Sequence, residues 1–399
     1  MATLAFMDLD KRPTSPAPTG VGRIALDGVA APTAVIDLAA FTANIGEMRE
    51  RAAGVPIRVA SKSIRVRGLI ERLLREEGYA GVLAYSAAEA LWLVEHGARD
   101  VLVAYPTVDR DTLAKVSADD VAAAEIAFMV DLPEHLAILD ESAGAHPLRA
   151  AIDVDCSMRV GPVTIGAHRS SVHSAKDAER LVLQARSLSG VRIAGLMFYD
   201  AQIAGVADTS SAIRLMKKAS LRELRRRRQQ VIATVTRHVT LDFVNAGGTG
   251  SLHLMHDDPA ITDLAAGSGL FTPRLFDHYD NTALRPAAYF VSPVVRKPTD
   301  DVVVAFSGGY IASGPAGAAR VPEVAFPEGL EPFAQEGYGE VQTPLRGDAA
   351  HGMKVGDLVW FRHAKAGEMC ERFDQVLLVE DGQVVERLPT YRGEGKNFG

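Results

Sequence analysis

The sequence has little cysteine, no long hydrophobic run and no excess of basic residues, and each absence excludes a class of protein. Its two cysteines are too few for a disulfide framework, so a reducing, cytoplasmic setting is expected. No apolar stretch approaches the roughly 20 residues that span a bilayer, and the first 20 residues lack the pattern of a signal peptide. With 43 Lys and Arg against 50 Asp and Glu, the net charge of −7 argues against nucleic acid as a partner.

What the sequence does have is a regular alternation of short apolar runs and longer stretches of helical periodicity. The chain of 399 residues is 47% hydrophobic, which fits one large barrel and a smaller domain. Continuous apolar runs separated by helices indicate a parallel sheet, and eight of them predict an α/β fold of the (β/α)8 TIM barrel type. An open, doubly wound sheet stays the alternative. The eight runs are Ile57–Ala60, Gly81–Tyr85, Val101–Ala104, Ala127–Val130, Ala150–Val154, Ile193–Met197, Leu241–Val244 and Asp263–Ala266.

The alternation ends after about Leu275. Beyond it, strand-like runs are separated by Gly, Pro and Asp clusters, and helical periodicity is scarce. We therefore expect a barrel over residues 30–275 and a second, β-rich domain over residues 276–399, with residues 1–29 able to pack on the latter. The strand-like runs are Val302–Phe306, Gly339–Thr343, Asp357–Phe361 and Gln375–Glu380.

Functional side chains of a barrel come from the C-terminal ends of its strands and from the loops that follow. The first run leads directly to Lys62, an amine that can act there as an imine-forming nucleophile, although a solvated lysine is the commoner interpretation of such a residue alone. The fifth run leads to Arg159, which can bond a ring nitrogen or a carboxylate or lie on the surface. The sixth leads to Tyr199 and Asp200, a phenol and an acid at the same mouth.

Glycine-rich turns follow the last two predicted strands. The residues after the seventh run read Asn245-Ala-Gly-Gly-Thr-Gly-Ser251, and those after the eighth read Gly267-Ser-Gly269. Glycines let backbone N–H groups approach an anion, and the loops after strands 7 and 8 are the usual phosphate site of such barrels. One such turn is weak evidence, but two at adjacent strand ends, facing a lysine, predict a phosphate site.

Two other segments attract attention. His363, Glu368 and Cys370 lie within one short segment of the β-rich domain and are residue types that bind divalent metals, although a buried histidine and an inert cysteine are the simpler interpretation. The basic run Arg225–Arg228 lies in a stretch of helical periodicity, so we expect it on a solvated helix face.

Together these pieces resemble the D-threonine aldolase and D-serine dehydratase branch of the fold-type III, alanine racemase-like pyridoxal-phosphate enzymes, with the amino-acid deaminase/aldolase group. The resemblance runs from about Pro32 to Glu386. It rests on the order and spacing of several motifs: the helix Ala39–Arg51, Arg58-x-x-x-Lys62, Asp153-x-Asp155 before Arg159-Val160-Gly161, Gly195–Asp200, Gly247–Gly250, and Gly356-Asp357 before His363.

The resemblance implies a homodimer that binds pyridoxal 5'-phosphate and a small amino-acid substrate, with no membrane partner. It implies that Lys62 binds the cofactor, with Arg159 near the ring and Tyr199 at its face as catalytic residues. The turn Gly247–Gly250 would hold the phosphate together with Ser268 and Gly269. The complete set of cofactor-binding residues would be Lys62, Arg159, Tyr199, Asn245, Gly247, Gly248, Thr249, Gly250, Ser268 and Gly269.

The resemblance also implies that His363 is a ligand of a divalent metal, Zn, Mn or Mg. The pattern has Cys or Asp two positions after this histidine, whereas this chain has Lys365. Cys370 is therefore preferred over Glu368 as the second ligand, because thiolate suits zinc.

The predicted function is that of a pyridoxal-phosphate lyase that acts on a small β-hydroxy amino acid, D-configured by resemblance, through metal-assisted retro-aldol cleavage or aldol-type transfer. A D-serine-type dehydratase or deaminase stays an alternative. So do an amino-acid racemase that uses Tyr310 or Tyr338, a non-catalytic carrier of the cofactor, and a barrel metalloenzyme without it.

Overall fold

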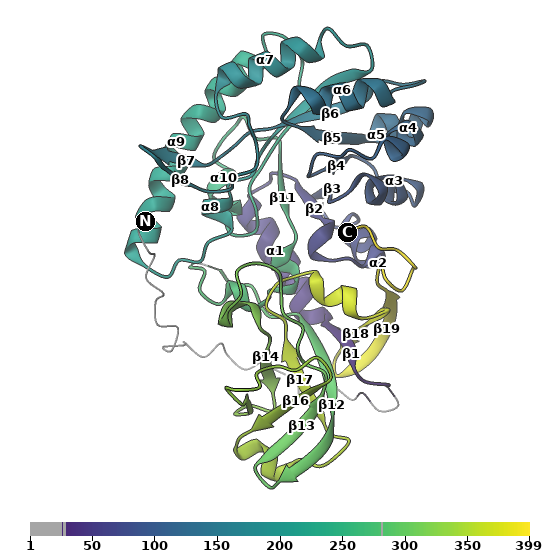
Figure 1. Cartoon of the computed structure of the whole chain (residues 1–399), viewed down its shortest axis with the longest axis vertical. Coiled ribbons are helices and arrows are strands. Elements are labelled where there is room, and N and C mark those ends of the chain that lie inside the picture. Colours follow the sequence, from purple (N-terminus) through teal and green to yellow (C-terminus); the bar gives the residue numbers. More distant parts are fainter. Residues whose placement is uncertain (1–25, 27–28, 281) are drawn as a thin grey trace.

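The computed structural model of the chain describes residues 26, 29–280 and 282–399. Figure 1 shows two parts, a barrel of parallel strands surrounded by helices and, below it, a domain made mainly of strands. The first 20 residues, for which no signal peptide is expected, lie outside the described residues. Within the described part of the chain, no helix is both long and apolar enough to cross a membrane.

The barrel is closed, with each strand parallel to both neighbours, in the order β10-β11-β2-β3-β4-β5-β6-β9. This confirms the TIM barrel and removes the open sheet. Each of the eight predicted apolar runs overlaps one of these strands. They are β2 (Ile57–Ala60), β3 (Tyr79–Ala84), β4 (Val101–Val103), β5 (Ile126–Val130), β6 (Leu148–Asp153), β9 (Val191–Phe198), β10 (Phe243–Ala246) and β11 (Asp263–Ala266).

Helices cover the outside of the barrel, and local sequence sets several of their starts. Asp37 and Ser86 cap the N-termini of α1 and α3, and Ser174 with Asp177 forms a capping box on α7. The helices are α1 (Leu38–Ala52), α2 (Arg67–Leu73), α3 (Ala87–Glu95), α4 (Arg110–Ala118), α5 (Asp120–Glu125), α6 (Pro133–Ser142), α7 (Ala175–Ala185), α8 (Ala201–Ala204), α9 (Ser211–Val235), α10 (Leu252–Met255) and α11 (Ser268–Phe271).

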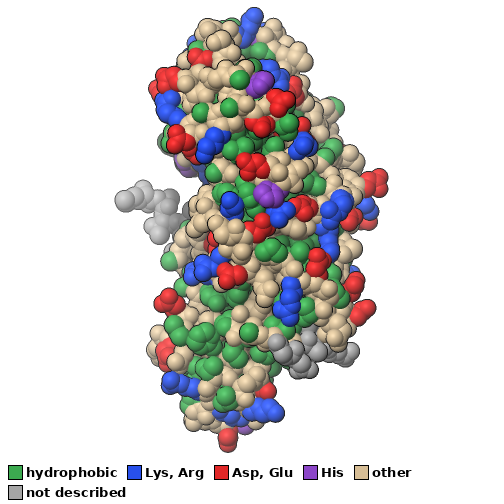
Figure 2. Space-filling model, turned by 90° about the vertical axis from the view of Figure 1, so that its right-hand side faces the viewer, with side chains coloured by type: hydrophobic (Ala, Val, Ile, Leu, Met, Phe, Trp, Pro, Cys, Tyr) green, Lys and Arg blue, Asp and Glu red, His purple; other side chains and the backbone are tan. Residues whose placement is uncertain are grey.

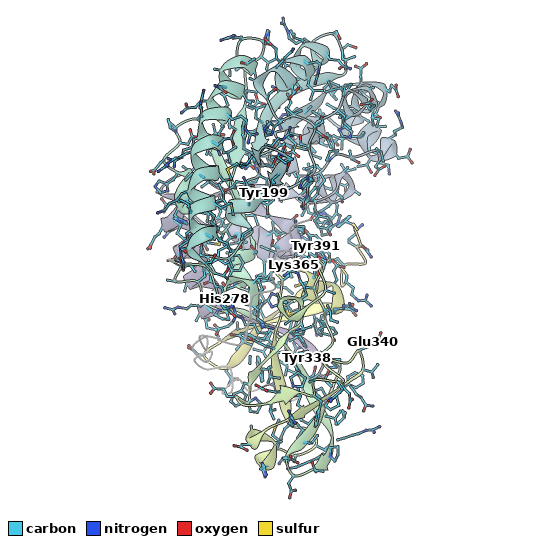
Figure 3. The ribbon with its side chains drawn as sticks, turned by 60° about the vertical axis from the view of Figure 1, so that its left-hand side comes forward. Tyr199, His278, Tyr338, Glu340, Lys365 and Tyr391 are labelled. Carbon is cyan, nitrogen blue, oxygen red and sulfur yellow. The ribbon has the colours of Figure 1, made fainter. Side chains whose placement is uncertain are left out.

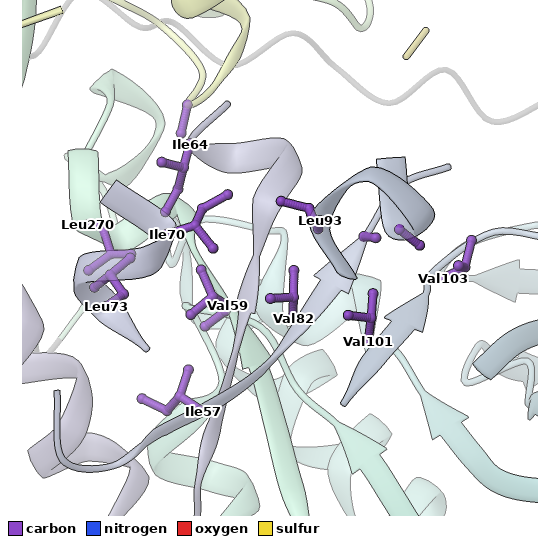
Figure 4. Packing of buried hydrophobic residues seen from close by; sticks show 14 of the residues in the cluster. Ile57, Val59, Ile64, Ile70, Leu73, Val82, Leu93, Val101, Val103 and Leu270 are labelled. Atoms are coloured by element: carbon purple, nitrogen blue, oxygen red, sulfur yellow. The ribbon is translucent and has the colours of Figure 1, made fainter. Parts of the chain in front are cut away.

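The core lies between these helices and the strands. Figure 4 shows Val59 and Val82 of neighbouring strands facing Ile70 of α2 and Leu93 of α3. The guanidinium of the buried Arg58 bridges two carboxylates: its Nε is 3.1 Å from the buried Asp263, and its Nη2 is 2.9 Å from Asp100, whose side chain is half exposed just before β4. A buried charge needs such partners, so Arg58 of the Arg58-x-x-x-Lys62 motif stabilises the barrel interior.

The second domain is a nine-stranded sheet. The strand β1 precedes the barrel in the chain, yet it pairs with β12 and β18 in this sheet. The boundary at residue 275 stays a prediction. The strands are β1 (Thr33–Asp37), β12 (Ala288–Thr299), β13 (Val302–Phe306), β14 (Glu323–Phe326), β15 (Glu331–Pro332), β16 (Gln342–Arg346), β17 (Leu358–Arg362), β18 (Gln375–Glu380) and β19 (Gln383–Pro389).

The four strands predicted in this domain are present with small shifts. Two have the predicted bounds, β17 begins one residue later and β16 three residues later than expected. The late start of β16 follows from a tight turn at Gly339, where a Cβ would lie 2.0 Å from the Gln342 carbonyl oxygen. Of residues 1–29, the described Leu26 and Val29 pack in a cluster on this sheet.

Candidate active site

Three turns from neighbouring barrel strands meet at the barrel mouth. Lys62 lies in η2 (Ser61–Ser63), directly after β2. Gly267, after β11, packs against this turn, since a Cβ there would lie 2.6 Å from the Ala60 carbonyl oxygen. In the next turn, after β10, Thr249 Oγ1 lies 3.2 Å from Ser268 Oγ and accepts a hydrogen bond from the Gly269 N–H at 3.2 Å. The structure thus brings the lysine and both glycine-rich turns together.

The two glycine-rich turns pack too closely for side chains. A Cβ at Gly250 would lie 2.3 Å from the Ala204 carbonyl oxygen, and a Cβ at Gly269 would lie 2.5 Å from Thr249 Cγ2. Gly247 has a positive φ of 81°, and the Gly248 N–H donates to Ser251 Oγ at 3.1 Å. A glycine backbone with two hydroxyl groups beside it suits a phosphate group. We call residues 247–251 and 267–269 the glycine cradle.

Lys62 extends into the open side of the mouth. Its side chain is exposed, and its Nζ donates to the Tyr105 hydroxyl at 2.7 Å. Tyr105 follows β4 and was not among the predicted site residues, although its place two positions past a strand end was a usable signal. An amine at the mouth beside the glycine cradle fits a cofactor with both a carbonyl and a phosphate group, such as pyridoxal phosphate.

Tyr199 and Asp200 follow β9, the neighbour of β10 on the other side. Burial, more than the charges of Asp200 and Tyr105, raises the pKa of Tyr199 to about 12, so it remains a protonated phenol at neutral pH. Burial also raises the pKa of Asp200 to about 7, and Ser251 Oγ donates to its carboxylate at 3.2 Å. Tyr199 therefore lies at the mouth (Figure 3), whereas Asp200 supports the glycine cradle from below.

Asn245 lies deeper than the other predicted cofactor residues. It is fully buried, and its side-chain amide donates to Asp263 Oδ1 at 2.5 Å, within the Arg58 network. Its own Oδ1 has no partner among the described residues. The structure places Asn245 under the cradle, inside the barrel.

Arg159 comes from the wall of the barrel opposite the strand that leads to Lys62. It follows β6, which lies diametrically across the closed barrel from β2. It sits on a ribbon of β7 (Met158–Val160) and β8 (Val163–Ile165), with Nη2 2.9 Å from Asp155 Oδ2. Arg159 and Asp155 line a cavity of about 350 Å³ with Asp131 and Arg169.

The carboxyl of Asp153 belongs to the same wall. Burial, reinforced by the neighbouring charge of Asp131, raises the pKa of Asp153 to about 7. An acid that titrates near neutral pH at a barrel mouth can exchange protons there. The sequence showed Asp153 only as part of a motif.

The expectation of a solvated face for Arg225–Arg228 is wrong for two of the four arginines. Arg228 is fully buried, with Nη1 2.7 Å from Asp258. Arg227 is also buried, and its guanidinium donates to the Ser157 carbonyl oxygen at 2.9 Å and to Glu223 at 2.7 Å. Arg227 thereby holds the loop that carries Arg159, a role that a run of basic residues does not reveal.

The predicted metal ligands lie in the second domain. His363, at the end of β17, is buried with Nδ1 3.1 Å from the Ala288 carbonyl oxygen, while its Nε2 has no partner among the described residues. Burial lowers the pKa of His363 to about 3. Cys370 lies in η6 (Glu368–Arg372) as a buried free thiol, and burial raises its pKa to about 12.

These donors do not fit a divalent metal. Over the described ranges, His, Cys, Asp and Glu residues form no group of three or more that could hold one. A thiol with a raised pKa is a poor ligand at neutral pH, because the thiolate is the form that binds metal. Tyr310 and Tyr338, the candidates for a racemase, pack against Phe290 and Phe361 with ring centroids 4.6 and 6.3 Å apart.

Comparison with known proteins identifies the family of the barrel. A family described as "Alanine racemase, N-terminal domain" matches residues 36–272. D-threonine aldolase from Arthrobacter sp is 25% identical over 284 residues, which cover 69% of this chain and 71% of that protein.

Solved structures show the same fold at lower identity. A D-threonine aldolase from Filomicrobium marinum has a TM-score of 0.78 and 21% identity, and the match covers 93% of this chain and 97% of that one. A D-threo-3-hydroxyaspartate dehydratase from Delftia sp. HT23 has a TM-score of 0.71 and 17% identity, with 91% and 98% covered. Two variants of that dehydratase carry alanine for a histidine and for a cysteine two positions later, and the cysteine variant is in a metal-free form.

Proposed function

The chain belongs to the alanine racemase N-terminal domain family of fold-type III pyridoxal-phosphate enzymes, and on this premise we propose that it is a lyase that cleaves a small D-β-hydroxy amino acid. The observation that carries the proposal is the meeting of Lys62 with the glycine cradle on three neighbouring strands. The D-threonine aldolase relative, similar over about two thirds of both chains, supports the aldol reaction and the D configuration.

The proposed site assigns a role to each residue of the mouth. The glycine cradle, with Thr249 and Ser268, would bind the phosphate of pyridoxal phosphate. Lys62 would bind its carbonyl carbon. Tyr199 would lie against its face, and Arg159 would approach the ring from the opposite wall.

The reaction would be retro-aldol cleavage. The β-hydroxyl loses its proton, the Cα–Cβ bond breaks, an aldehyde leaves, and a proton returns to Cα of the remaining amino acid. When bound, pyridoxal phosphate supplies the electron sink for the broken bond.

The protein's own groups would manage the protons. The Nζ of Lys62 lies within hydrogen-bond reach of Tyr105, so that its amine, when not bonded to the cofactor, would be able to take up the proton of the β-hydroxyl and return one to Cα. Because the phenol of Tyr199 is protonated at neutral pH, Tyr199 cannot act as a base there and can only donate its proton. Because the residues of the His363 segment do not fit a metal, no step is assigned to one.

The test is Lys62→Ala in protein supplied with pyridoxal phosphate. We expect loss of the visible absorption band of the lysine-bound cofactor and loss of turnover, whereas the exposed Lys354, changed to Ala as a control, should alter neither. A panel of D- and L-β-hydroxy amino acids then identifies the reaction. Aldehyde from the D series supports the lyase. Keto acid would indicate a dehydratase, an inverted amino acid a racemase, and bound cofactor without turnover a carrier.

We also propose that the chain acts as a homodimer, as the resemblance implies. Figure 2 shows hydrophobic side chains gathered on one face over the second domain. Half or more of the residue surface is exposed at Ile311, Val341 and Val355 of this domain, and exposed apolar patches mark protein interfaces. Light scattering of the purified protein should give twice the chain mass, and a monomer at micromolar concentration would contradict the proposal.

A further inference from the structure

The segment that follows β17 carries a second amine, on Lys365. Its Nζ donates to Ser313 Oγ at 2.5 Å and lies 3.1 Å from Glu368 Oε1. Ser313 completes the network, because its N–H and hydroxyl donate to the Glu368 carboxylate at 2.8 and 2.5 Å. These three side chains, which we call the Lys365 triad, fix the ammonium in place.

The segment is docked on the turn that carries Lys62. At Gly367, whose φ is +87°, a Cβ would lie only 1.9 Å from the Lys62 carbonyl oxygen. An ion pair of 3.1 Å between Arg65 and Glu371 holds the same two segments together. Figure 3 shows Lys365 at the boundary between the barrel and the second domain. The Lys365 triad is therefore positioned by the same backbone that positions the cofactor lysine.

The ammonium of Lys365 has one donor to spare. A lysine has three N–H donors, and Ser313 and Glu368 account for two of them among the described residues. The side chain of Lys365 is 39% exposed, so a small molecule can reach it. An ammonium held in one geometry can donate to, and stabilise, an oxygen that carries negative charge.

The side chain of Lys365 is also unsuited to bind a metal. A dehydratase with the same fold has been solved with a histidine changed to alanine and, separately, with a cysteine two positions later changed to alanine, the latter in a metal-free form. Two positions after His363 this chain has Lys365, whose ammonium is an ion-pair partner rather than an electron-pair donor. Glu368 is already occupied by Ser313 and Lys365.

We propose that Lys365 binds the β-oxygen substituent of the substrate directly, so that this enzyme handles that group with a fixed ammonium and without a metal at His363. The proposal deepens the proposed function and rests on it for the identity of the substrate. It makes Lys365 a residue that selects β-hydroxy amino acids over those that lack the oxygen. Glu368 and Ser313 are positioning residues that act through Lys365.

The first experiment measures metal binding to the cofactor-loaded protein. We expect titration with Zn²⁺ or Mn²⁺ to show no tight site, and the activity to survive treatment with EDTA. Lys365→Cys places a thiol two positions after His363, whose Nε2 has no partner among the described residues, and we expect this variant to bind zinc more tightly than the natural protein by at least about tenfold. One equivalent of tightly bound metal in the natural protein, with activity lost on chelation, would overturn the proposal.

The second experiment measures selectivity. Binding of D-serine and D-alanine is followed by calorimetry in the Lys62→Ala background, in which no turnover is expected. In Lys365→Met, we expect D-serine to bind about ten- to a hundredfold more weakly, the cost of a charge-assisted hydrogen bond. D-alanine and the cofactor should bind as before, as both ligands should in Lys354→Met.

Equal losses for D-serine and D-alanine in Lys365→Met would overturn the role of Lys365, because the damage would then be general. Thermal unfolding of both variants separates this from misfolding. In Glu368→Gln, a partial loss confined to D-serine is expected, since the ammonium stays but is held less firmly. Failure of the proposed function has a different signature in the natural protein: keto acid, an inverted amino acid or no turnover in place of aldehyde, or the absence of the lysine-bound cofactor band.

Discussion

The glycine cradle and the segment that carries the Lys365 triad both contact the Lys62 turn, yet they depend on the fold in different ways. The cradle is built from turns after neighbouring parallel strands, and each turn contacts the next. The triad joins Lys365 and Glu368 to Ser313, more than 50 residues earlier in the chain. The closed barrel therefore positions the proposed cofactor side, while loop residues would decide the chemistry of the proposed substrate side.

The largest effect is expected from Gly367→Ala, which should disrupt the contact between the Lys365 segment and the Lys62 turn. A Cβ here overlaps the Lys62 carbonyl oxygen, and the positive φ adds backbone strain. We expect a loss of about 2–5 kcal/mol in the free energy of unfolding, measured by urea denaturation, together with a weakened cofactor band. Gly356→Ala is the matched control, because Gly356 has a φ of +97° but nothing within 4 Å. Similar losses in both variants would contradict a specific contact between the segment and Lys62.

A substitution in the glycine cradle should lower mainly the affinity for the cofactor. A Cβ at Gly250 would lie 2.3 Å from the Ala204 oxygen and 2.5 Å from Tyr279 Cε1, so Gly250→Ala must displace the turn. We expect affinity for pyridoxal phosphate to fall by about ten- to a hundredfold, or about 1–3 kcal/mol, in an absorbance titration. Gly46→Ala in α1, with nothing within 4 Å, should leave that affinity unchanged. Unchanged affinity in Gly250→Ala would remove the cradle from the phosphate site.

The sequence predicted the cradle side better than the substrate side, for a physical reason. The barrel strands are buried on both faces, so they read as continuous apolar runs, and barrel geometry then brings their ends together. The strand β12 was missed because Pro293 and Pro298 interrupt its apolar run. The place of β1 in the second sheet depends on pairing with residues more than 250 positions away, which no local pattern records.

Side-chain partners were the least predictable feature. Lys365 was visible as a departure from the expected metal pattern, but its partner Ser313 was not, since nothing in a loop sequence marks a contact across 52 residues. Arg227 and Arg228 looked solvated because a basic run usually is, and only their burial against the loop after β6 and against Asp258 shows otherwise.

Two carboxyl groups near the Lys62 turn should respond to pH with opposite signs. Glu89, buried beneath the turn, accepts hydrogen bonds from the Tyr391 hydroxyl at 2.8 Å and the Tyr85 N–H at 2.7 Å, yet burial raises its pKa to about 7. Burial also acts on Glu368, but hydrogen bonds from Ser313 and the charge of Lys365 outweigh it and lower its pKa.

The signs follow from proton linkage. Because folded Glu89 binds its proton more tightly than unfolded Glu89, its contribution to stability falls as the pH rises from about 4.3 to about 7. Glu368 contributes stability above its ordinary pKa and loses it as the pH falls through the lowered value. Between about pH 5 and pH 7, the free energy of unfolding of Glu89→Gln should fall less steeply with pH than that of the natural protein. The difference between the two slopes should reach up to about 1.4 kcal/mol per pH unit.

Glu368→Gln is the matched variant on the substrate side. This variant should show the same slope as the natural protein between about pH 5 and pH 7. The difference in stability between the two proteins should shrink only at lower pH, where Glu368 of the natural protein takes up its proton. The same slope in Glu89→Gln and in the natural protein would show that Glu89 does not titrate in this range.

The smallest expected effect comes from Thr249→Val, which keeps the shape of the side chain and removes its hydroxyl. Thr249 Oγ1 accepts from the Gly269 N–H and lies beside Ser268 Oγ, so the hydroxyl can serve as a link between the turns and as a donor to the phosphate. A lost hydrogen bond of this kind costs about 1 kcal/mol, and we expect affinity for pyridoxal phosphate to fall about fivefold by absorbance titration. The exposed Thr236, directly after the last residue of α9, changed to Val, controls for the substitution itself. If affinity stays constant while stability falls, Thr249 holds the two turns together and the phosphate contacts come from the glycine backbone alone.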